Sequence, residues 1–363
     1  MLSICCLLLT PSACPSSRYC VYSLLPYMRD HGVEVSVSPF WSPQAYSKIQ
    51  KGQLRSAEYS ARLGQGYLKR VVDMVNASRA DAVWIQRFAL PAGTRLLGAT
   101  LKAIGRPLVF GYDDAVYVSS GKKNLVRSWF GSWRDVNWLI SNSDLVIARN
   151  GGLAAHARQY NSHVCMIPSG IDVSYYDHML AGVARGREDT STFVIGWIGT
   201  PSGVPYLELA RPALELLGRE GPVELRIVGG GAFSLDSVSV RHITWREETE
   251  VQELAQMDVG IAPMPDDEWA RGKSGLKVVQ YMGCGVPVVA SAIGVHLELI
   301  ESGKQGFLVR STEEWIQALR ALRDDRMLRA AMGLAGRQTV RLKHDFPLIG
   351  KAHADALMQV GRP

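Results

Sequence analysis

Short hydrophobic runs alternate along the first half of the chain with longer segments in which apolar residues recur every three or four positions. The runs that predict strands are 2–9, 33–37, 82–85, 108–112, 145–148 and 164–167. The longer segments include 17–31 and 63–78, and their periodicity predicts helices. Strands that alternate with helices in this way indicate a parallel sheet with helices on both faces.

The alternation stops over residues 175–192, which are rich in Gly, Arg and Asp and are interpreted as a linker, and it then starts again. The predicted strands of the second half are 193–198, 224–228, 243–245, 259–263, 286–291 and 307–309. Two closing helices are predicted over 327–342 and 346–358. The sequence therefore predicts an α/β protein of two Rossmann-like halves, with domains over 1–174 and 175–344.

The apolar run at residues 2–9 has two interpretations, because it ends near Ala13-Cys14 as a lipoprotein signal would. The run is short and no basic residue precedes it, so a buried first strand is favoured. No apolar run approaches about 18 residues, and no membrane-spanning helix is expected. A cytoplasmic location follows as the expectation, with peripheral contact at the inner face of a membrane as an alternative.

The net charge and the cysteine pattern limit the classes of ligand that the chain is expected to bind. The net charge of +6 fits an acidic ligand such as a nucleotide, or an anionic membrane surface. Lysine and arginine form no block, so nucleic acid is not an expected partner. The six cysteines contain no C-x-x-C pair, and neither a zinc site nor a disulfide framework is expected.

The segment 270–291 contains the largest group of candidate ligand-binding residues. A basic loop with two glycines leads into a predicted helix, and a second glycine pair precedes a buried strand. Lys273, Lys277 and Gln280 are spaced to share one face of that helix. Free N–H groups at a helix start bind anions, and glycine lets a ligand approach the backbone. A phosphorylated ligand is expected at this segment, held by Arg271, Lys273, Ser274, Gly275, Leu276, Lys277 and Gln280.

This segment resembles the donor-binding helix of retaining glycosyltransferases of the GT-B fold, especially family 4. The family pattern continues in a Gly-x-Pro-Val-Val-Ala-Ser strand, which is present here as residues 285–291. The resemblance implies two Rossmann-like domains facing across a cleft, with the last helix, 345–363, packed back on the first domain. It also implies a nucleotide-sugar donor of the UDP or GDP type, and neither a metal ion nor another cofactor.

Asp113 and Asp114 follow the predicted strand 108–112. Two adjacent carboxylates cannot both face a core, so at least one faces a ligand or pairs with a cation. Many family 4 members carry His-Asp at this place, and the resemblance implies that Asp113 or Asp114 contacts the sugar or the acceptor as a catalytic group. A structural ion pair is the alternative.

Two further strand ends in the first half are candidates. The loop after the first strand holds Ser16, Ser17 and Arg18. Ser17 is expected to cap the following helix, and the resemblance places the loop near the acceptor and the donor phosphates. A plain capped turn is the alternative. Arg87 ends the strand that starts at residue 82, in a segment that resembles the Ile-Gln-Arg of some family 4 members. A surface residue at a strand end is the alternative, which we favour slightly.

The donor side of the second half departs from the family. The turn with Gly199 and Thr200 lacks the Arg and Lys that hold the diphosphate, so Arg271, Lys273 and Lys277 are the substitutes. The family's paired glutamates are replaced by Gly272 and Gln280, and Gln280 is expected to bind ribose through its amide. Trp245 is expected at the nucleobase, with a core tryptophan as the equal alternative.

Together these features predict a metal-independent, retaining glycosyltransferase that moves a sugar to a hydroxyl acceptor. The acceptor is a sugar, a lipid-linked molecule or a small molecule, in the synthesis of a polysaccharide, glycolipid or glycosylated metabolite. One alternative is a nucleotide-sugar epimerase or hydrolase on the same fold. The other is a catalytically silent nucleotide-sugar-binding subunit, which the missing glutamates favour.

Overall fold

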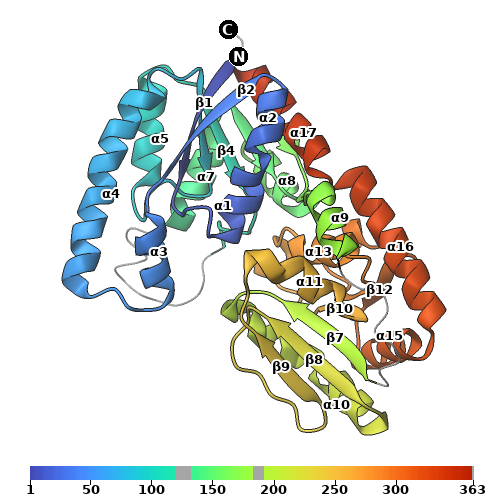
Figure 1. Ribbon diagram of the computed structural model, residues 1–363. Coiled ribbons are helices and arrows are strands. Elements are labelled where there is room, and N and C mark those ends of the chain that lie inside the picture. The colour runs from blue at the N-terminus through green and yellow to red at the C-terminus, as the bar shows by residue number, and fades with distance from the viewer. Residues whose placement is uncertain (119–131, 183–191, 362–363) are drawn as a thin grey trace. The chain divides into compact units, whose positions relative to one another are not determined.

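The computed structural model describes residues 1–118, 132–182 and 192–361, the side chains of 132–134 excepted. Contacts divide the chain into two units. Unit 1 comprises Met1–Ser169, Gly272–Ser274 and Phe346–Pro363, and unit 2 comprises Gly170–Arg271 and Gly275–Asp345. Each unit holds a six-stranded parallel sheet with helices around it (Figure 1), as the alternating pattern predicts.

The sheet of unit 1 has the strand order β2-β1-β3-β4-β5-β6. Its strands are β1 (Leu2–Leu8), β2 (Val33–Pro39), β3 (Ala82–Gln86), β4 (Leu108–Tyr112), β5 (Leu145–Ala148) and β6 (Val164–Met166). The chain leaves β1 for one edge and returns to its other side at β3. Ligands of such sheets bind beyond the carboxyl ends of the strands at this point of reversal.

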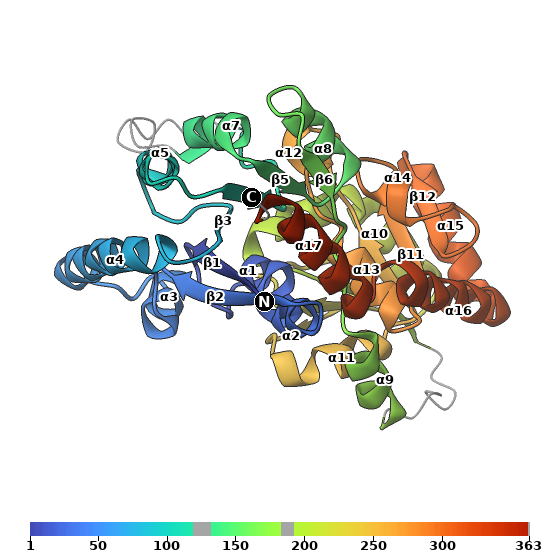
Figure 2. The same cartoon turned by 90° about the horizontal axis from the view of Figure 1, so that it is seen from above.

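Helices cover both faces of the unit 1 sheet. The helices include α1 (Pro15–Cys20), α2 (Leu25–Asp30), α3 (Pro43–Gln50), α4 (Ser56–Ala77), α5 (Thr94–Ala103), α7 (Ser132–Asn142), α8 (Gly151–Arg158) and α17 (Phe346–Val360). The last helix, α17, buries Phe346, Ile349 and Leu357 in one core with Ile4 and Trp84 of the sheet. Figures 1 and 2 show α4 along the outer edge of this unit.

The sheet of unit 2 has the order β12-β11-β10-β7-β8-β9. Its strands are β7 (Phe193–Ile198), β8 (Val223–Val228), β9 (Ser239–Ile243), β10 (Val259–Ala262), β11 (Val288–Ser291) and β12 (Gly306–Val309). Its helices include α9 (Val173–Ala181), α10 (Arg211–Glu220), α11 (Glu250–Ala255), α12 (Glu268–Arg271), α13 (Leu276–Gly283), α14 (His296–Leu299), α15 (Thr312–Asp324) and α16 (Arg326–Lys343). The order reverses at β7, so the carboxyl ends of β7 and β10 mark the second site for ligands.

Several predicted elements differ from the structure. The predicted helix 63–78 begins seven residues earlier, at Ser56. The predicted helix 17–31 is two short helices, because the backbone turns at Val21 (φ −135°) and α2 starts anew with Pro26 in its first turn. The predicted linker from 175 begins inside α9, whose start is capped by the Asp172 carboxylate. The predicted strand 243–245 lies earlier in the chain, at β9.

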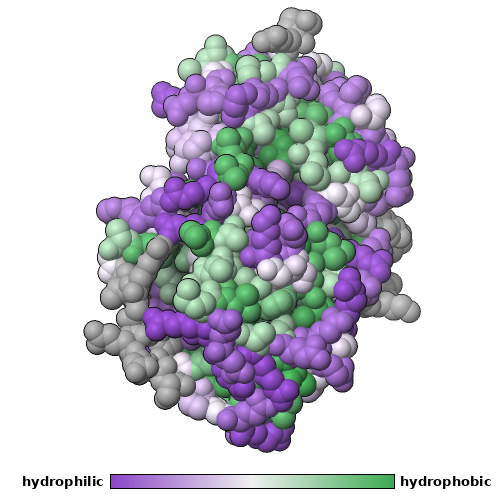
Figure 3. Space-filling model, turned by 90° about the vertical axis from the view of Figure 1, so that its right-hand side faces the viewer, coloured by the Kyte–Doolittle hydropathy of each residue, from purple (hydrophilic) through white to green (hydrophobic). Residues whose placement is uncertain are grey.

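Figure 3 shows one face of the molecule, on which hydrophobic residues lie among hydrophilic ones. Such a mixture is usual for a protein surface. None of the helices in the described ranges combines the length and the hydrophobicity that a membrane span requires.

Candidate functional site

An ion-pair network occupies the carboxyl ends of β3 and β4 in unit 1. Arg87 Nε lies 3.5 Å from Asp113 Oδ1, and Arg87 Nη2 lies 3.2 Å from Asp114 Oδ2. Asp113 is buried and Asp114 partly so. The two carboxylates that the sequence singles out therefore share one guanidinium, and Arg87 is part of the candidate site, whereas we predicted a surface residue.

The backbone at Arg87 is unusual. Its φ of +59° is the one positive value among the described non-glycine residues, and its N–H donates to the Gly111 carbonyl at 2.7 Å. Burial lowers the pKa of the Arg87 guanidinium, but Asp113 and Asp114 together raise it further, so the net pKa is above its ordinary value. A left-handed backbone at a polar residue is strained, and such residues concentrate at functional sites.

Lys273 completes this network. Its Nζ lies 3.1 Å from Asp114 Oδ1, and its carbonyl accepts a hydrogen bond of 2.8 Å from Asn150 Nδ2. Helix α13 begins only at Leu276, so Lys273 precedes the helix that we predicted would carry it on one face with Lys277 and Gln280. Two carboxylates thus meet two cations in unit 1, and Ser274 lies in the same short segment of that unit.

Gly272 explains one missing family glutamate. A Cβ built on Gly272 would lie 2.4 Å from the Ala115 Cβ and 2.8 Å from the Ala115 nitrogen. Backbone atoms cannot move aside cheaply, so this position has no room for any side chain. A glutamate side chain at this position would overlap Ala115, which lies three residues after the end of β4.

The loop after β1 holds the other candidates of unit 1. Ser17 is the third residue of α1 and not its cap, because Cys14 is the N-cap and Pro15 follows it. The Ser17 hydroxyl instead donates to the Thr10 carbonyl at 2.8 Å. The Arg18 guanidinium lies 4.8 Å from the ring centroid of its neighbour Tyr19. Ser16 Oγ is buried and has no hydrogen-bond partner among the described residues.

In unit 2, glycines follow β7 and β8 where the backbone comes close to two tryptophans. A Cβ on Gly199 would lie 2.6 Å from the Trp197 ring. Gly229 has a φ of +79°, and a Cβ there would lie 3.0 Å from both the Gly199 carbonyl oxygen and the Trp245 Cβ. The ends of β7, β8 and β9 therefore meet at Gly199, Gly229 and Trp245.

Lys277 reaches the same place from the first turn of α13. Its Nζ lies 4.2 Å from the centroid of the Trp197 ring, which holds the ammonium over an aromatic face. Gly275 caps the helix in the left-handed conformation with a φ of +70°, and Leu276 is the first helical residue. One cation of the first helical turn thus lies over the Trp197 ring, which lies beside Gly199 in the turn after β7.

Glu250 joins Trp245 to Gln280. Its Oε2 accepts a bond of 2.6 Å from Trp245 Nε1, and its Oε1 accepts one of 2.7 Å from Gln280 Nε2. Glu250 and Gln280 are both buried. Sequence reasoning missed Glu250, and its one signal was an acidic residue five positions after Trp245.

His296 lies in the neighbourhood of Lys277. Its Nδ1 lies 2.9 Å from the Ser291 carbonyl oxygen, which fixes the proton on Nδ1. Burial, and to a lesser degree the Lys277 charge, lower the pKa of His296 to about 4, against the bond to Ser291. The imidazole is therefore neutral at physiological pH.

Two predicted donor residues have partners within their own loops. Arg271 is mostly exposed, and its Nε lies 2.7 Å from Asp266 Oδ1. Thr200 Oγ1 lies 2.9 Å from the Ser202 hydroxyl. Neither contact joins the residue to Lys277 or Trp245.

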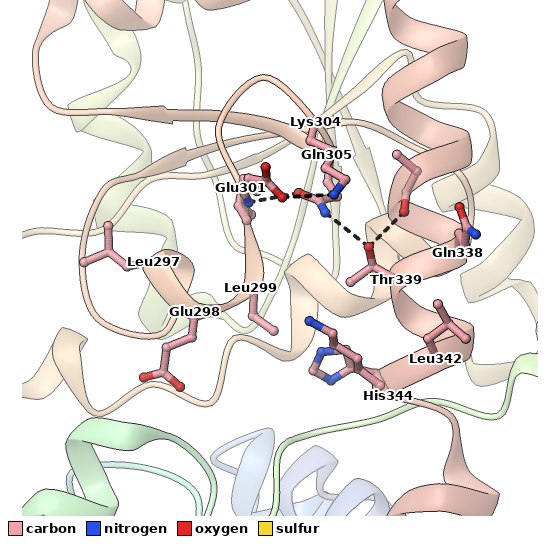
Figure 4. A pocket seen from close by; sticks show the side chains of 13 residues that line it. Leu297, Glu298, Leu299, Glu301, Lys304, Gln305, Gln338, Thr339, Leu342 and His344 are labelled. Atoms are coloured by element: carbon pink, nitrogen blue, oxygen red, sulfur yellow. Dashed lines mark hydrogen bonds and ion pairs between the residues drawn. The ribbon is translucent and has the colours of Figure 1, made fainter.

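A separate pocket of about 530 Å³ opens in unit 2 between the segment 297–305 and the second half of α16. Its wall is held by Gln305 Nε2, which lies 3.2 Å from Thr339 Oγ1 (Figure 4). None of the predicted site residues lines it, so it does not mark the donor site.

The second half matches a family model. Residues 192–325 match the model of the glycosyl transferases group 1. Among curated proteins, the chain is 26% identical over 226 residues to the D-inositol 3-phosphate glycosyltransferase of Corynebacterium jeikeium, which covers 54% of this chain and 52% of the relative. The chain thus spans about half the length of that relative.

A second relative matches over a longer range. The GDP-mannose-dependent monoacylated alpha-(1-6)-phosphatidylinositol monomannoside mannosyltransferase of Corynebacterium glutamicum is 24% identical, over 80% of each chain.

Solved structures share the whole fold. HepE of Anabaena in complex with UDP and glucose has a TM-score of 0.70 at 18% identity, covering 99% of this chain and 100% of that one. The sucrose-phosphate synthase of Thermosynechococcus elongatus has a TM-score of 0.69 at 13% identity, covering 99% of each. The chain therefore has the GT-B fold and resembles the glycosyltransferases of family 4.

Proposed function

We propose that the protein is a glycosyltransferase that moves a sugar from a nucleoside diphosphate to a hydroxyl acceptor, with retention at the sugar carbon. The observation that carries the proposal is the cluster at the ends of β7, β8 and β9. There Gly199 and Gly229 carry no side chain beside Trp197 and Trp245, Lys277 supplies a cation at a helix N-terminus, and Trp245 supplies an aromatic face. These are the groups that a diphosphate and a nucleobase require.

The same cluster supports the leaving-group chemistry. Negative charge develops on the diphosphate as the bond to the sugar breaks, and a fixed cation with helix N–H groups stabilises that charge. Lys277 and the start of α13 would provide this, so the proposal includes no metal ion. The leaving phosphate would help to deprotonate the acceptor hydroxyl on the same face of the sugar, which gives retention.

Unit 1 would supply the acceptor side. Asp113 is buried beside Arg87, and its Oδ1 makes no hydrogen bond within the described residues. A carboxylate so placed can accept a bond from a sugar hydroxyl. The names of the two relatives give D-inositol 3-phosphate and a monoacylated phosphatidylinositol monomannoside, which supports a polyol or sugar, free or lipid-linked, as the acceptor class.

A silent nucleotide-sugar-binding subunit is a second candidate. The side chain absent at Gly272, together with the pairing of Asp114 with two cations, favours it. Incubation of the purified protein with UDP- and GDP-sugars, with and without inositol phosphate, distinguishes the two. Release of nucleoside diphosphate that rises with the acceptor supports transfer. Donor binding without release in any mixture would indicate the silent subunit.

A further inference from the structure

Helix α4 of unit 1 carries its hydrophobic and charged residues on unexpected faces. The large apolar side chains Leu68, Val71, Val72 and Val75 are 71%, 62%, 61% and 52% exposed. They follow the spacing i, i+3, i+4, i+7 and so form one stripe. An ordinary surface helix buries such a stripe and exposes its charges.

The opposite face of α4 shows what the helix buries instead. That face presents Arg70 and Asp73, which form an ion pair of 2.5 Å at 3% and 8% side-chain exposure. Arg70 also donates to the carbonyl oxygens of Ala89 and Ser38, both at 3.0 Å, and the Ser38 hydroxyl donates to Asp73. The charged groups of the inner face are paired within unit 1, whereas more than half of each side chain in the apolar outer stripe is left exposed, which indicates an external partner.

The charged residues around the stripe indicate which kind of partner it binds. Of the charged side chains that α4 does not bury, the acid Glu58 lies 2.8 Å from Lys48 and 3.8 Å from Arg62, so its charge is balanced. Lys69 is an exposed cation, and its Nζ donates to the Pro39 carbonyl at 2.5 Å. Arg55 and Arg79 add exposed cations just beyond the two ends of the helix. Two copies joined through this stripe would bring these cationic flanks together. An apolar stripe with basic flanks fits an anionic lipid surface.

We propose that the outer face of α4 rests on an anionic lipid bilayer, with Leu68, Val71, Val72 and Val75 at the headgroup boundary. The exposed Arg55, Lys69 and Arg79 then contact lipid phosphates. The helix lies in the plane of the interface and does not cross the membrane. The proposal is independent of the sugar-transfer reaction, because it needs only the stripe and its charges.

Co-sedimentation of the full chain with vesicles tests this. One set is phosphatidylcholine alone, and the other contains about one-third phosphatidylglycerol. The wild type should pellet with the anionic vesicles and less with the neutral ones. The Leu68→Ser/Val72→Ser variant should bind the anionic vesicles at least about tenfold more weakly. The control Leu334→Ser/Leu342→Ser, which changes two leucines of α16 that are 72% and 67% exposed, should bind as the wild type does.

Both variants change surface positions, and thermal melts will verify that they fold. Equal binding of the α4 variant and the wild type would overturn the proposal, as would a wild type that binds neither vesicle. Sedimentation velocity tests the alternative that a second copy of the chain binds the stripe. A wild-type dimer that becomes a monomer in the α4 variant would assign the stripe to a second copy of the chain, and the lipid assignment would be wrong.

Discussion

Gln280 donates its amide to the Glu250 carboxylate at 2.7 Å, and both side chains are buried in unit 2. The amide that was expected to reach a ribose is thus engaged with an acid from α11. That acid also holds Trp245 through the indole N–H. The carboxylate missing from position 280 is therefore present close by, on a different element.

Because of this pairing, we expect Gln280→Glu to destabilise the folded protein. The substitution removes the donor and sets two carboxylates against each other, so one of them takes up a proton and its pKa rises. We expect a loss of about 1–3 kcal/mol of unfolding free energy at neutral pH. The folded variant binds more protons than the unfolded one, so the loss shrinks as the pH falls towards the ordinary carboxyl pKa.

Urea denaturation of the wild type and Gln280→Glu at several pH values measures this loss. Gln338→Glu makes the same chemical change at an exposed site of α16 and should leave stability unchanged. A Gln280→Glu variant as stable as the wild type at neutral pH would show that the two side chains are not bonded.

Lys277→Ala should weaken nucleoside diphosphate binding about 10- to 100-fold, because a charged hydrogen bond is lost at the start of α13. Calorimetric titration measures the affinity. Lys304→Ala removes a lysine that pairs with Glu301 on the surface, and it should bind as the wild type does. Equal affinities in the two variants would remove Lys277 from the donor site.

Asp113→Asn should lower turnover of a nucleotide sugar by about tenfold or more, since it removes charge from the reacting side of unit 1. The melting temperature should change much less, because the amide keeps the shape. Asp144→Asn changes an exposed acid and serves as the control. A collapse of thermal stability with normal activity per folded molecule would make Asp113 structural.

Gly272→Ala should destabilise the protein by about 1–3 kcal/mol, because its methyl group would overlap Ala115. Gly182→Ala is the matched control, since a Cβ there has no atom within 4 Å. Differential scanning calorimetry compares the two. Equal melting temperatures would show that the close approach of Gly272 to Ala115 is absent in solution.

Two buried histidines give stability a pH dependence. Burial lowers the pKa of His296 to about 4 and that of His353 to about 3, from an unfolded value of 6.5. The unfolded chain therefore binds more protons, so stability is full above about pH 6.5 and is lost as the pH falls towards 4. His296→Gln should reduce the slope of unfolding free energy against pH in this window. An unchanged slope of unfolding free energy against pH would show that His296 is not a neutral, buried imidazole in the folded protein.

The sequence predicts most of the fold because each strand is a local hydrophobic run. The strands 108–112, 145–148 and 193–198 have their predicted bounds. Edge strand β9 was misplaced because its half-exposed residues carry no such run. The site is harder to predict from the sequence, because its contacts join residues that are far apart along the chain.

Glu250 and Gln280 are 30 positions apart, and Arg87 meets Asp113 only because β3 and β4 are neighbours in the sheet. Spacing along one predicted helix placed Lys277 correctly and Lys273 wrongly, since the helix start depends on the left-handed Gly275.

Calorimetric titration of UDP and GDP into the wild-type chain tests the central claim most directly. The account predicts that one of them binds at a single site with a dissociation constant well below about 1 mM, and that the bare nucleoside binds more weakly because it lacks the diphosphate. Failure of both nucleotides to bind at that concentration would contradict a nucleotide-sugar site in unit 2.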